Sequence, residues 1–122
     1  MIGYATIGTN DLERATGYYN ALLAPMGASM LMDFGRGRAW GTAPNQPMLS
    51  AILPFDGQPA QPGNGTMSAL LCTSRAQVDA QCKLALQLGG TDEGAAGPRG
   101  DGFYAGYFRD LDGNKLCFCC FG

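Results

Sequence analysis

Two segments of the chain have the periodicity of an amphipathic helix, and each follows a short apolar run typical of a strand. In both segments the apolar residues recur at intervals of three and four, which places them on one helix face. They are Leu12, Ala15, Tyr19, Leu22, Leu23 and Met26 in the first segment, and Val78, Cys82, Ala85, Leu86 and Leu88 in the second. Strand-like residues 3–7 and 67–71 precede them. The sequence therefore contains one strand–helix unit twice, about 63 residues apart.

Both predicted helices have start and stop signals. Asn10 is the expected N-cap of the first, with Glu13 completing a box-like arrangement, and Ser74 with Gln77 repeats this in the second. Glycine follows each helix at Gly27 and at 89–90, where a left-handed residue ends it.

Short strands follow each predicted helix. The first set covers residues 29–33, 38–42 and 48–53; the second covers a weak strand at 91–93 and strong strands at 103–109 and 115–121. Between these last strands, Asp110 to Asn114 form a turn in which Gly113 and Asn114 can adopt positive φ. Residues 94–102 are rich in glycine and predict a loop.

The element order β-α-β-β-β, present twice, predicts an α+β fold with internal pseudo-twofold symmetry. We expect one domain over residues 1–122, with a first module at about 1–55 and a second at about 66–122. The Pro- and Gly-rich residues 56–65 have too few apolar side chains to fold alone, so they form the linker. Paired modules of this kind predict a ligand cleft between their sheets.

Composition narrows the possible partners. The net charge is −2 and the eight basic residues are scattered, which argues against nucleic-acid binding. No apolar run approaches the roughly 20 residues of a membrane span, and no signal peptide is visible before the expected first strand. Five cysteines, an odd number without an export signal, indicate reduced thiols and a cytoplasmic protein.

Several motifs resemble the vicinal oxygen chelate superfamily, which includes glyoxalase I, bleomycin-resistance proteins and extradiol dioxygenases. Residues 10–15, with Tyr18-Tyr19 and Leu22-Leu23 after them, resemble the first-helix signature of that family. Residues 63–66 resemble the segment before its fifth strand, and Gly89-Gly90 the close of its second helix. Residues 109–114 resemble its Asp-Pro-Asp-Gly-Asn turn, with Leu111 in place of proline. The resemblance implies two βαβββ modules whose curved mixed sheets form a cleft, and often a homodimer.

Metal-dependent relatives hold a divalent ion through His, Gln or Glu on four strands. The resemblance places these ligand positions at Tyr4, near Ser50, at Met67 and at Cys117. The chain has no histidine, and these side chains do not replace imidazole and carboxylate donors. We therefore expect no metal cofactor. Met67, Cys117 and Cys119 could instead bind a soft metal, although core packing is the favoured interpretation of these sulfur side chains.

Strand-borne aromatic and basic side chains supply a candidate ligand site. If one parity of each strand faces the cleft, the lining comprises Tyr4, Arg38, Trp40, Met67 and Cys117, with Ser50 beside them. Such a surface suits an aromatic or amphipathic anion. The alternative is that Trp40 and the other aromatics fill the core under the helices. Cys117 has Lys115 two residues away, a weak indication of a reactive thiol.

Three functions remain open at this point. The favoured one is a protein that lacks the family metal and binds or sequesters a small, partly apolar molecule in its cleft. The second is a metal-dependent lyase or isomerase like glyoxalase I. The third is a non-catalytic interaction domain whose cleft is filled by side chains. Whether the chain is an enzyme stays undecided, because no catalytic residues can be assigned.

Overall fold

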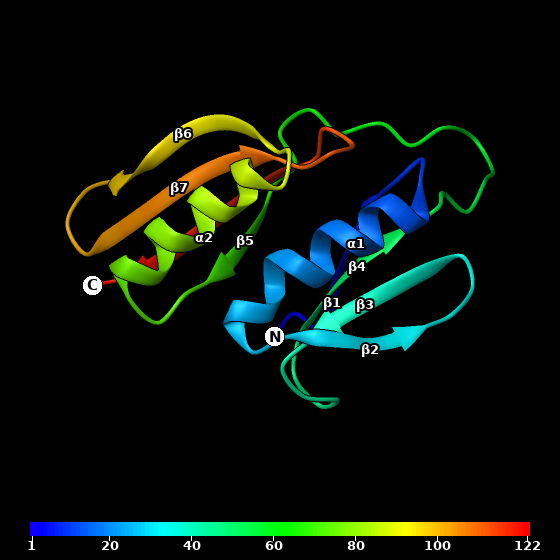
Figure 1. The fold of residues 1–122 in the computed structure, drawn as a ribbon, viewed down its shortest axis with the longest axis horizontal. Helices are drawn as coiled ribbons and strands as arrows, with labels where there is room; N and C mark the ends of the chain where they lie inside the picture. The colour runs from blue at the N-terminus through cyan, green and yellow to red at the C-terminus, as the bar shows by residue number, and fades with distance from the viewer. The chain divides into compact units, whose positions relative to one another are not determined.

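The computed structural model describes residues 1–122 and divides them into two compact units, Met1–Pro62 and Gly63–Gly122. Figure 1 shows the elements in chain order. The first unit contains β1 (Tyr4–Gly8), α1 (Leu12–Leu23), η1 (Ala24–Met26), β2 (Ser29–Asp33), β3 (Gly37–Gly41) and β4 (Met48–Ile52). The second contains β5 (Ser68–Leu71), α2 (Arg75–Gln87), β6 (Thr91–Pro98), β7 (Phe103–Arg109) and β8 (Lys115–Phe121).

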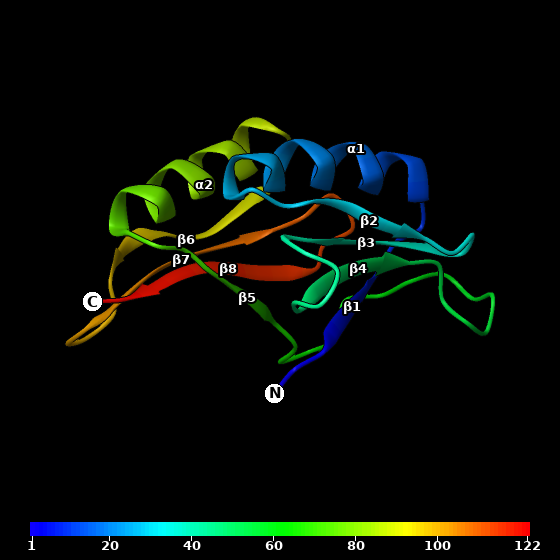
Figure 2. The ribbon, with the colours of Figure 1, turned by 90° about the horizontal axis from the view of Figure 1, so that it is seen from below.

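Each unit is one four-stranded mixed sheet with one helix. The strand orders are β1-β4-β3-β2 and β5-β8-β7-β6. In both, the first strand pairs in parallel with the last, and the other pairings are antiparallel. Each helix packs on one face of its own sheet, and Figure 2 shows the opposite face without a helix. The predicted α+β class with two βαβββ modules is confirmed.

The core of each unit lies between its helix and its sheet. In the first unit, Tyr19 and Leu22 of α1 are almost fully buried, and the Tyr19 and Trp40 rings lie 5.5 Å apart. In the second, Val78 and Ala85 of α2 are buried, and so are Phe108 and Phe118, whose stacked rings lie 5.3 Å apart. These four helix residues belong to the predicted apolar stripes. In α2, however, Leu86 of the predicted stripe is 39% exposed, and Gln81 is buried instead.

The start of α1 differs from the prediction by one residue. Asp11, not Asn10, is the N-cap: its side chain accepts a 3.0 Å hydrogen bond from the Arg14 amide. Asn10 instead exchanges two hydrogen bonds with the backbone of Ala60, which fastens the segment after β4 to the start of α1. Glu13 forms no capping box, because its carboxylate contacts Arg38 on β3.

The other predicted helix signals are confirmed. The Ser74 hydroxyl accepts a 3.1 Å hydrogen bond from the Gln77 amide, and the Gln77 side chain accepts one from the Thr73 amide. Gly27 has a φ of 77° and follows a short 3-10 turn that contains Pro25. Glycine tolerates this left-handed conformation at no steric cost, which lets the chain turn from helix to β2.

Residues 94–98 were wrongly expected in a loop. They belong to β6, an eight-residue edge strand whose pairing with β7 shifts register twice, on either side of Gly94. Bulges of this kind are common on edge strands, and glycine accommodates them. Because these bulges interrupt the alternation of inward and outward residues, the sequence of β6 does not show the periodicity of a regular strand.

The turn between β7 and β8 is organised by Asp110. Its buried carboxylate accepts hydrogen bonds from the Asp112 and Asn114 amides and from the Asn114 side chain. Gly113 adopts a φ of 86°, whereas no residue other than glycine has positive φ, so Asn114 does not. The turn sets the register in which Arg109 lies opposite Lys115.

None of the helices combines the length and apolar character needed to cross a membrane.

Candidate functional site

The helix-covered face of the first sheet carries two of the predicted site residues. The Arg38 guanidinium donates to the Thr16 hydroxyl and the Glu13 carboxylate of α1, at 2.8 Å each. The Trp40 indole donates to Asn20 Oδ1 at 2.8 Å, and its side chain is only 2% exposed. Both residues therefore join the sheet to α1.

The opposite face carries Tyr4 and Ser50. Strand register places Arg38 and Trp40 opposite Ala51 and Leu49, and it places Tyr4 opposite Met48. Because successive side chains of a strand point to opposite faces, Tyr4 and Ser50 lie on the helix-free face. Tyr4 is 70% exposed, whereas Ser50 is buried and its hydroxyl donates to the Arg38 carbonyl at 3.0 Å.

The expectation that Tyr4, Arg38 and Trp40 line one face was therefore wrong. Side chains alternate between the two faces within each strand, as expected. Which side chains of β1 share a face with those of β3, however, depends on how each strand pairs with β4. Trp40 matches the alternative interpretation, as a core residue beneath the helix.

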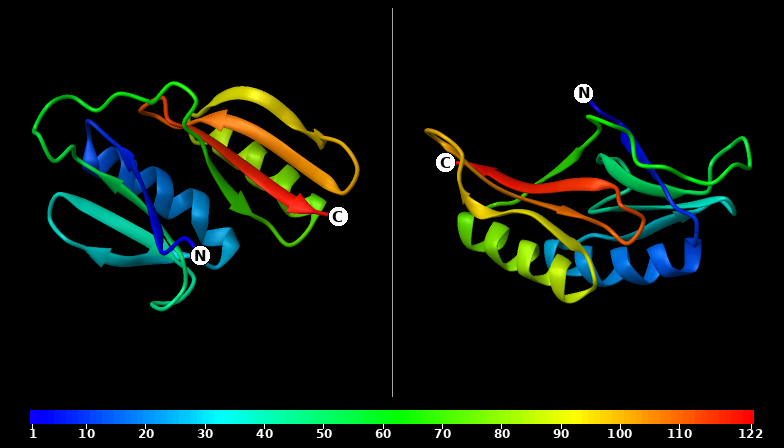
Figure 3. Two further views of the ribbon diagram at one scale, coloured as in Figure 1. Left: turned by 180° about the vertical axis from the view of Figure 1, so that it is seen from behind. Right: turned by 90° about the horizontal axis from the view of Figure 1, so that it is seen from above.

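In the second unit, Cys117 lies on the helix-free face of its sheet. It forms a buried cluster with Ala105 and Cys119, against which the half-buried Phe103 and Tyr107 rings pack. Met67, immediately before β5, is 43% exposed. Cys120, the neighbour of Cys119, lies opposite Tyr104, whose hydroxyl contacts Asp79 of α2, so the vicinal cysteines point to opposite faces as expected. In the left view of Figure 3, the strands of the second unit lie in front of α2.

A basic group beside this cluster was not part of the predicted site. Lys115 Nζ lies 5.5 Å from the centre of the Tyr107 ring, and Arg99 Cζ lies 5.4 Å from it. The register of β7 and β8 places Tyr107 opposite Cys117. The sequence could have predicted that Tyr107 lies opposite Cys117, because strands that pair outward from the turn at 110–114 bring these two residues together. Arg99 was hidden in the expected glycine-rich loop.

Burial keeps the thiols of Cys117, Cys72 and Cys82 protonated. It raises the pKa of Cys117 to about 12, and the neighbouring Cys119 adds to the effect. Burial likewise raises the pKa of Cys72 to about 12 and that of Cys82 to about 11. A thiolate is both the nucleophile and the metal-binding form of cysteine. At neutral pH the Cys117 side chain is therefore a weak nucleophile and a poor ligand, despite Lys115 nearby.

The residues that the resemblance places at the family's metal-ligand positions do not fit a divalent ion. They offer a phenol, a hydroxyl already donated to a carbonyl, a thioether and a protonated thiol. Within each unit, no group of three or more His, Cys, Asp or Glu side chains could hold a metal ion. Zinc and related ions need deprotonated thiolate, imidazole or carboxylate donors.

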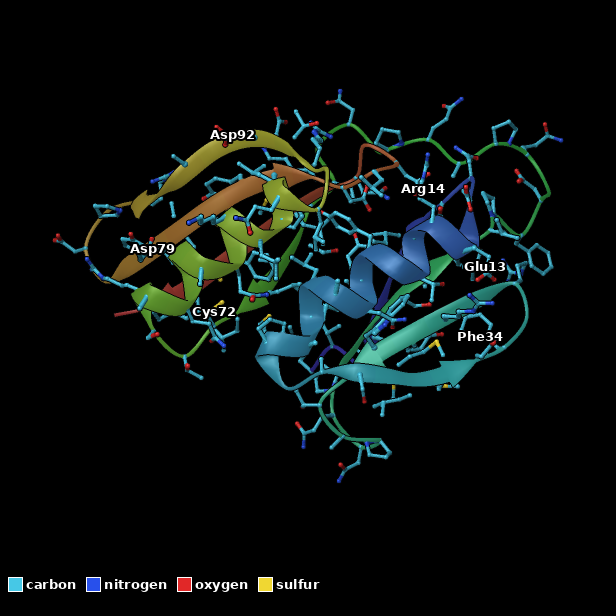
Figure 4. The ribbon with its side chains drawn as sticks, in the orientation of Figure 1. Glu13, Arg14, Phe34, Cys72, Asp79 and Asp92 are labelled. Carbon is cyan, nitrogen blue, oxygen red and sulfur yellow. The ribbon has the colours of Figure 1, made fainter.

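The acidic side chains have structural contacts rather than a shared site. Figure 4 labels Glu13, Asp79 and Asp92, which lie on different elements. The hydrogen bond from Arg38 lowers the pKa of Glu13, and Asp33 also faces that guanidinium at 3.4 Å. Glu93 forms an ion pair with Arg109 at 2.8 Å.

Comparison with known proteins agrees with this architecture. The family model of the Glyoxalase/Bleomycin resistance protein/Dioxygenase superfamily matches residues 1–118. A glyoxalase/bleomycin resistance protein from Albidiferax ferrireducens T118 is 32% identical, with a TM-score of 0.91 over 100% of this chain and 99% of that one. No curated protein sequence matches the chain significantly.

Two more distant structures share the fold. A glyoxalase-related enzyme from Fulvimarina pelagi is 19% identical, with a TM-score of 0.76 over 98% of this chain and 87% of the other. A lactoylglutathione lyase from Agrobacterium tumefaciens is 20% identical, with a TM-score of 0.70 over 98% and 92%. From the family match and the similarity to the Albidiferax protein, the chain belongs to the glyoxalase/bleomycin resistance protein/dioxygenase superfamily.

Proposed function

We propose that this protein works without the family metal and binds or sequesters a small, partly apolar molecule on the helix-free faces of its sheets. The observation that carries the proposal is the donor set at the family's ligand positions. Tyr4, Ser50, Met67 and Cys117 are polar or sulfur side chains that a divalent ion does not favour. On this proposal the chain keeps the family fold but lacks side chains that could hold the family's metal ion.

Exposed apolar side chains support binding on these faces. In the first unit, Tyr4 is 70% exposed and Met32, which lies opposite Ala39 on the same face, is 50% exposed. In the second, Phe121 and Leu71 are 76% and 63% exposed. Exposed aromatic and thioether groups beside small buried residues suit a ligand with a flat apolar part.

The decisive experiment measures the metal content of untagged, unchelated protein by plasma mass spectrometry. We expect less than about a tenth of an equivalent of any transition metal, because the expected ligand positions lack imidazole and carboxylate donors. The measurement is informative because a metal held in a protein site binds tightly enough to survive purification. A broad thermal-shift screen with small molecules then seeks ligands. If about one equivalent of nickel, iron, zinc or manganese is present, or no compound raises the melting temperature, the proposal is wrong.

A metal-dependent lyase remains the alternative function, because one structural relative is a lactoylglutathione lyase. It predicts turnover of a glutathione hemithioacetal on addition of Ni²⁺ or Zn²⁺ and loss of that turnover on chelation. We expect no turnover, since the expected ligand positions carry no carboxylate or imidazole to hold the ion and move the proton.

Thiol accessibility tests the donor argument separately. Because burial raises the pKa of Cys117 and Cys72 to about 12, both should resist alkylation by iodoacetamide at pH 8 in the folded protein. Peptide mapping after a short reaction measures this, and the protein unfolded in guanidinium is the control in which all five cysteines react. Rapid labelling of Cys117 in the folded state would restore it as a candidate nucleophile or ligand.

The proposal includes a homodimer, as the family resemblance implies. Light scattering coupled to size-exclusion chromatography tests it directly. A monomeric mass at high micromolar concentration would remove the dimer from the proposal without affecting the binding function. A monomer that also binds no small molecule would instead favour a non-catalytic interaction domain.

A further inference from the structure

We propose that Arg99 and Lys115, which both lie over the Tyr107 ring, form an anion-recognition site on the helix-free face of the second sheet. We infer that the ligand is a planar aromatic carboxylate or a molecule of the same chemistry. This inference rests on the proposed small-molecule binding and specifies its ligand class. It is argued from four features of the second unit.

Arg99 is held in place by the backbone beneath it. Its Nη2 donates to the Ala95 carbonyl at 2.6 Å and its Nη1 to the Pro98 carbonyl at 3.3 Å. A guanidinium has five N–H donors in a fixed plane, so these two bonds orient the group and leave donors for a ligand. An oriented guanidinium loses less conformational entropy on binding than a free side chain.

Two glycines of β6 make room for this arrangement. A Cβ at Gly97 would lie 3.2 Å from Arg99 Nη1, and a Cβ at Gly94 would lie 3.1 Å from the Tyr107 ring. The absence of side chains at these positions therefore lets the guanidinium lie close to the sheet beside the ring. The bulged, glycine-containing path of β6 thus has a direct consequence for the placement of Arg99.

Neither cation has an acidic partner. In the second unit Arg109 forms an ion pair with Glu93, and no carboxylate forms one with Arg99 or Lys115. Both instead lie over the Tyr107 ring, 5.4 and 5.5 Å from its centre. Cation–π contacts of this kind orient a cation without neutralising it. The site therefore has two positive charges available to an anion.

The surface next to the cations is apolar. Ala105, Cys117 and Cys119 are buried in the sheet, and Phe103 and Tyr107 pack against them while remaining partly exposed. An apolar aromatic surface beside two unneutralised cations is complementary to a flat ring that carries a carboxylate. A charge-assisted hydrogen bond to guanidinium would fix the carboxylate, and the ring would stack.

The test compares two probes that differ only in charge. 2-Naphthoate carries a carboxylate, and 2-naphthamide has the same ring and shape without the charge. Isothermal titration of the full-length protein should show that naphthoate binds about tenfold more tightly, with a preference that shrinks as salt is raised.

Variants then locate the effect. Lys115→Met should weaken naphthoate binding about three- to tenfold and leave naphthamide binding unchanged, since only the charged probe uses the ammonium group. Lys83→Met is the matched control, because it removes the same charge from an exposed position on α2. Tyr107→Leu should weaken both probes. Unchanged naphthamide binding by Lys115→Met also shows that the variant is folded.

Equal binding of the two probes, or equal effects of Lys115→Met and Lys83→Met, would overturn the anion site. So would failure of naphthoate to bind. None of these results contradicts the proposed function if the broad screen yields neutral ligands. A screen in which no compound binds contradicts the function itself, so the two failures are distinguishable.

Discussion

The two units share element order and strand pairing but differ in how each helix is attached. Long polar side chains of β3 reach α1, with Arg38 bonded to Thr16 and Glu13 and Trp40 to Asn20. In the second unit, α2 approaches its sheet closely enough that Cys82 would collide with any side chain at Gly106. One topology is thus stabilised by two different sets of contacts.

The helix-free faces differ in charge. In the first unit none of the strand residues on that face is charged; they include Tyr4, Thr6, Met32, Ser50 and Ile52. In the second, the face carries Lys115 and Arg109, with Arg99 beside them. Since helix packing uses only one face of each sheet, the other face is free to acquire different binding chemistry without a change of fold.

The largest expected effect comes from the aromatic core of the first unit. Trp40→Ala should lower the free energy of unfolding by about 3–5 kcal/mol, because it opens a cavity beside Tyr19 and removes the bond to Asn20. Chemical denaturation measures the loss, and Phe121→Ala, at an exposed position, is the control. A stable Trp40→Ala variant that loses ligand binding would instead return Trp40 to the binding site.

A glycine pair tests the close approach in the second unit. Gly106→Ala should destabilise the protein by about 1–3 kcal/mol through overpacking against Cys82 and the Ala96 backbone. Gly17→Ala in α1 meets no atom within 4 Å and should stabilise the helix by about 0.5–1 kcal/mol. Thermal unfolding distinguishes the two signs. A neutral Gly106→Ala would mean that α2 is not closely packed.

The helix caps should behave alike in the two units. Asp11→Ala and Ser74→Ala each remove an acceptor for one amide, of Arg14 and of Gln77, and each should cost about 1 kcal/mol. Urea denaturation measures both changes. Asn10→Ala decides whether Asn10 or Asp11 is the cap. It should leave helix content unchanged by circular dichroism and expose the Ala60 region to proteolysis.

The smallest effect concerns the exposed ion pair of the first unit. The Arg38 hydrogen bond lowers the pKa of Glu13 below its usual value of 4.5, so the pair stabilises the fold above that pH and loses this contribution as pH falls. Melting temperatures of wild type and Glu13→Gln should therefore differ slightly at pH 7 and converge near pH 3. Asp101→Asn, at an exposed loop position, is the control. A constant difference across this range would contradict the assignment.

Local signals explain why much of the fold was predictable. Strands 29–33, 103–109 and 115–121 were predicted with the bounds observed, because apolar runs there are flanked by turn residues. The Ser74 cap and the Gly27 stop depend on neighbouring residues alone. By contrast, the cap at Asp11 was missed because Asn10 is an equally good capping residue, and tertiary contact with Ala60 decided between them.

The candidate binding site was less predictable, because it depends on pairing between distant strands. A period of two fixes which residues of one strand share a face, so Cys117 and Cys119 could be grouped correctly. It does not fix the parity of one strand relative to another, and so Tyr4 was wrongly grouped with Arg38 and Trp40. Arg99 beside Tyr107 was hidden because glycines and bulges interrupt the periodicity of β6.

By itself, the sequence determined the order of elements, the family resemblance and the lack of histidine donors, since these follow from local periodicity, capping and residue identity. Only the tertiary structure decided that Arg38 and Trp40 contact α1 and that Lys115 and Arg99 lie over the Tyr107 ring. Long-range strand register selects the face on which each side chain lies, and that register arises from contacts between residues far apart in the chain.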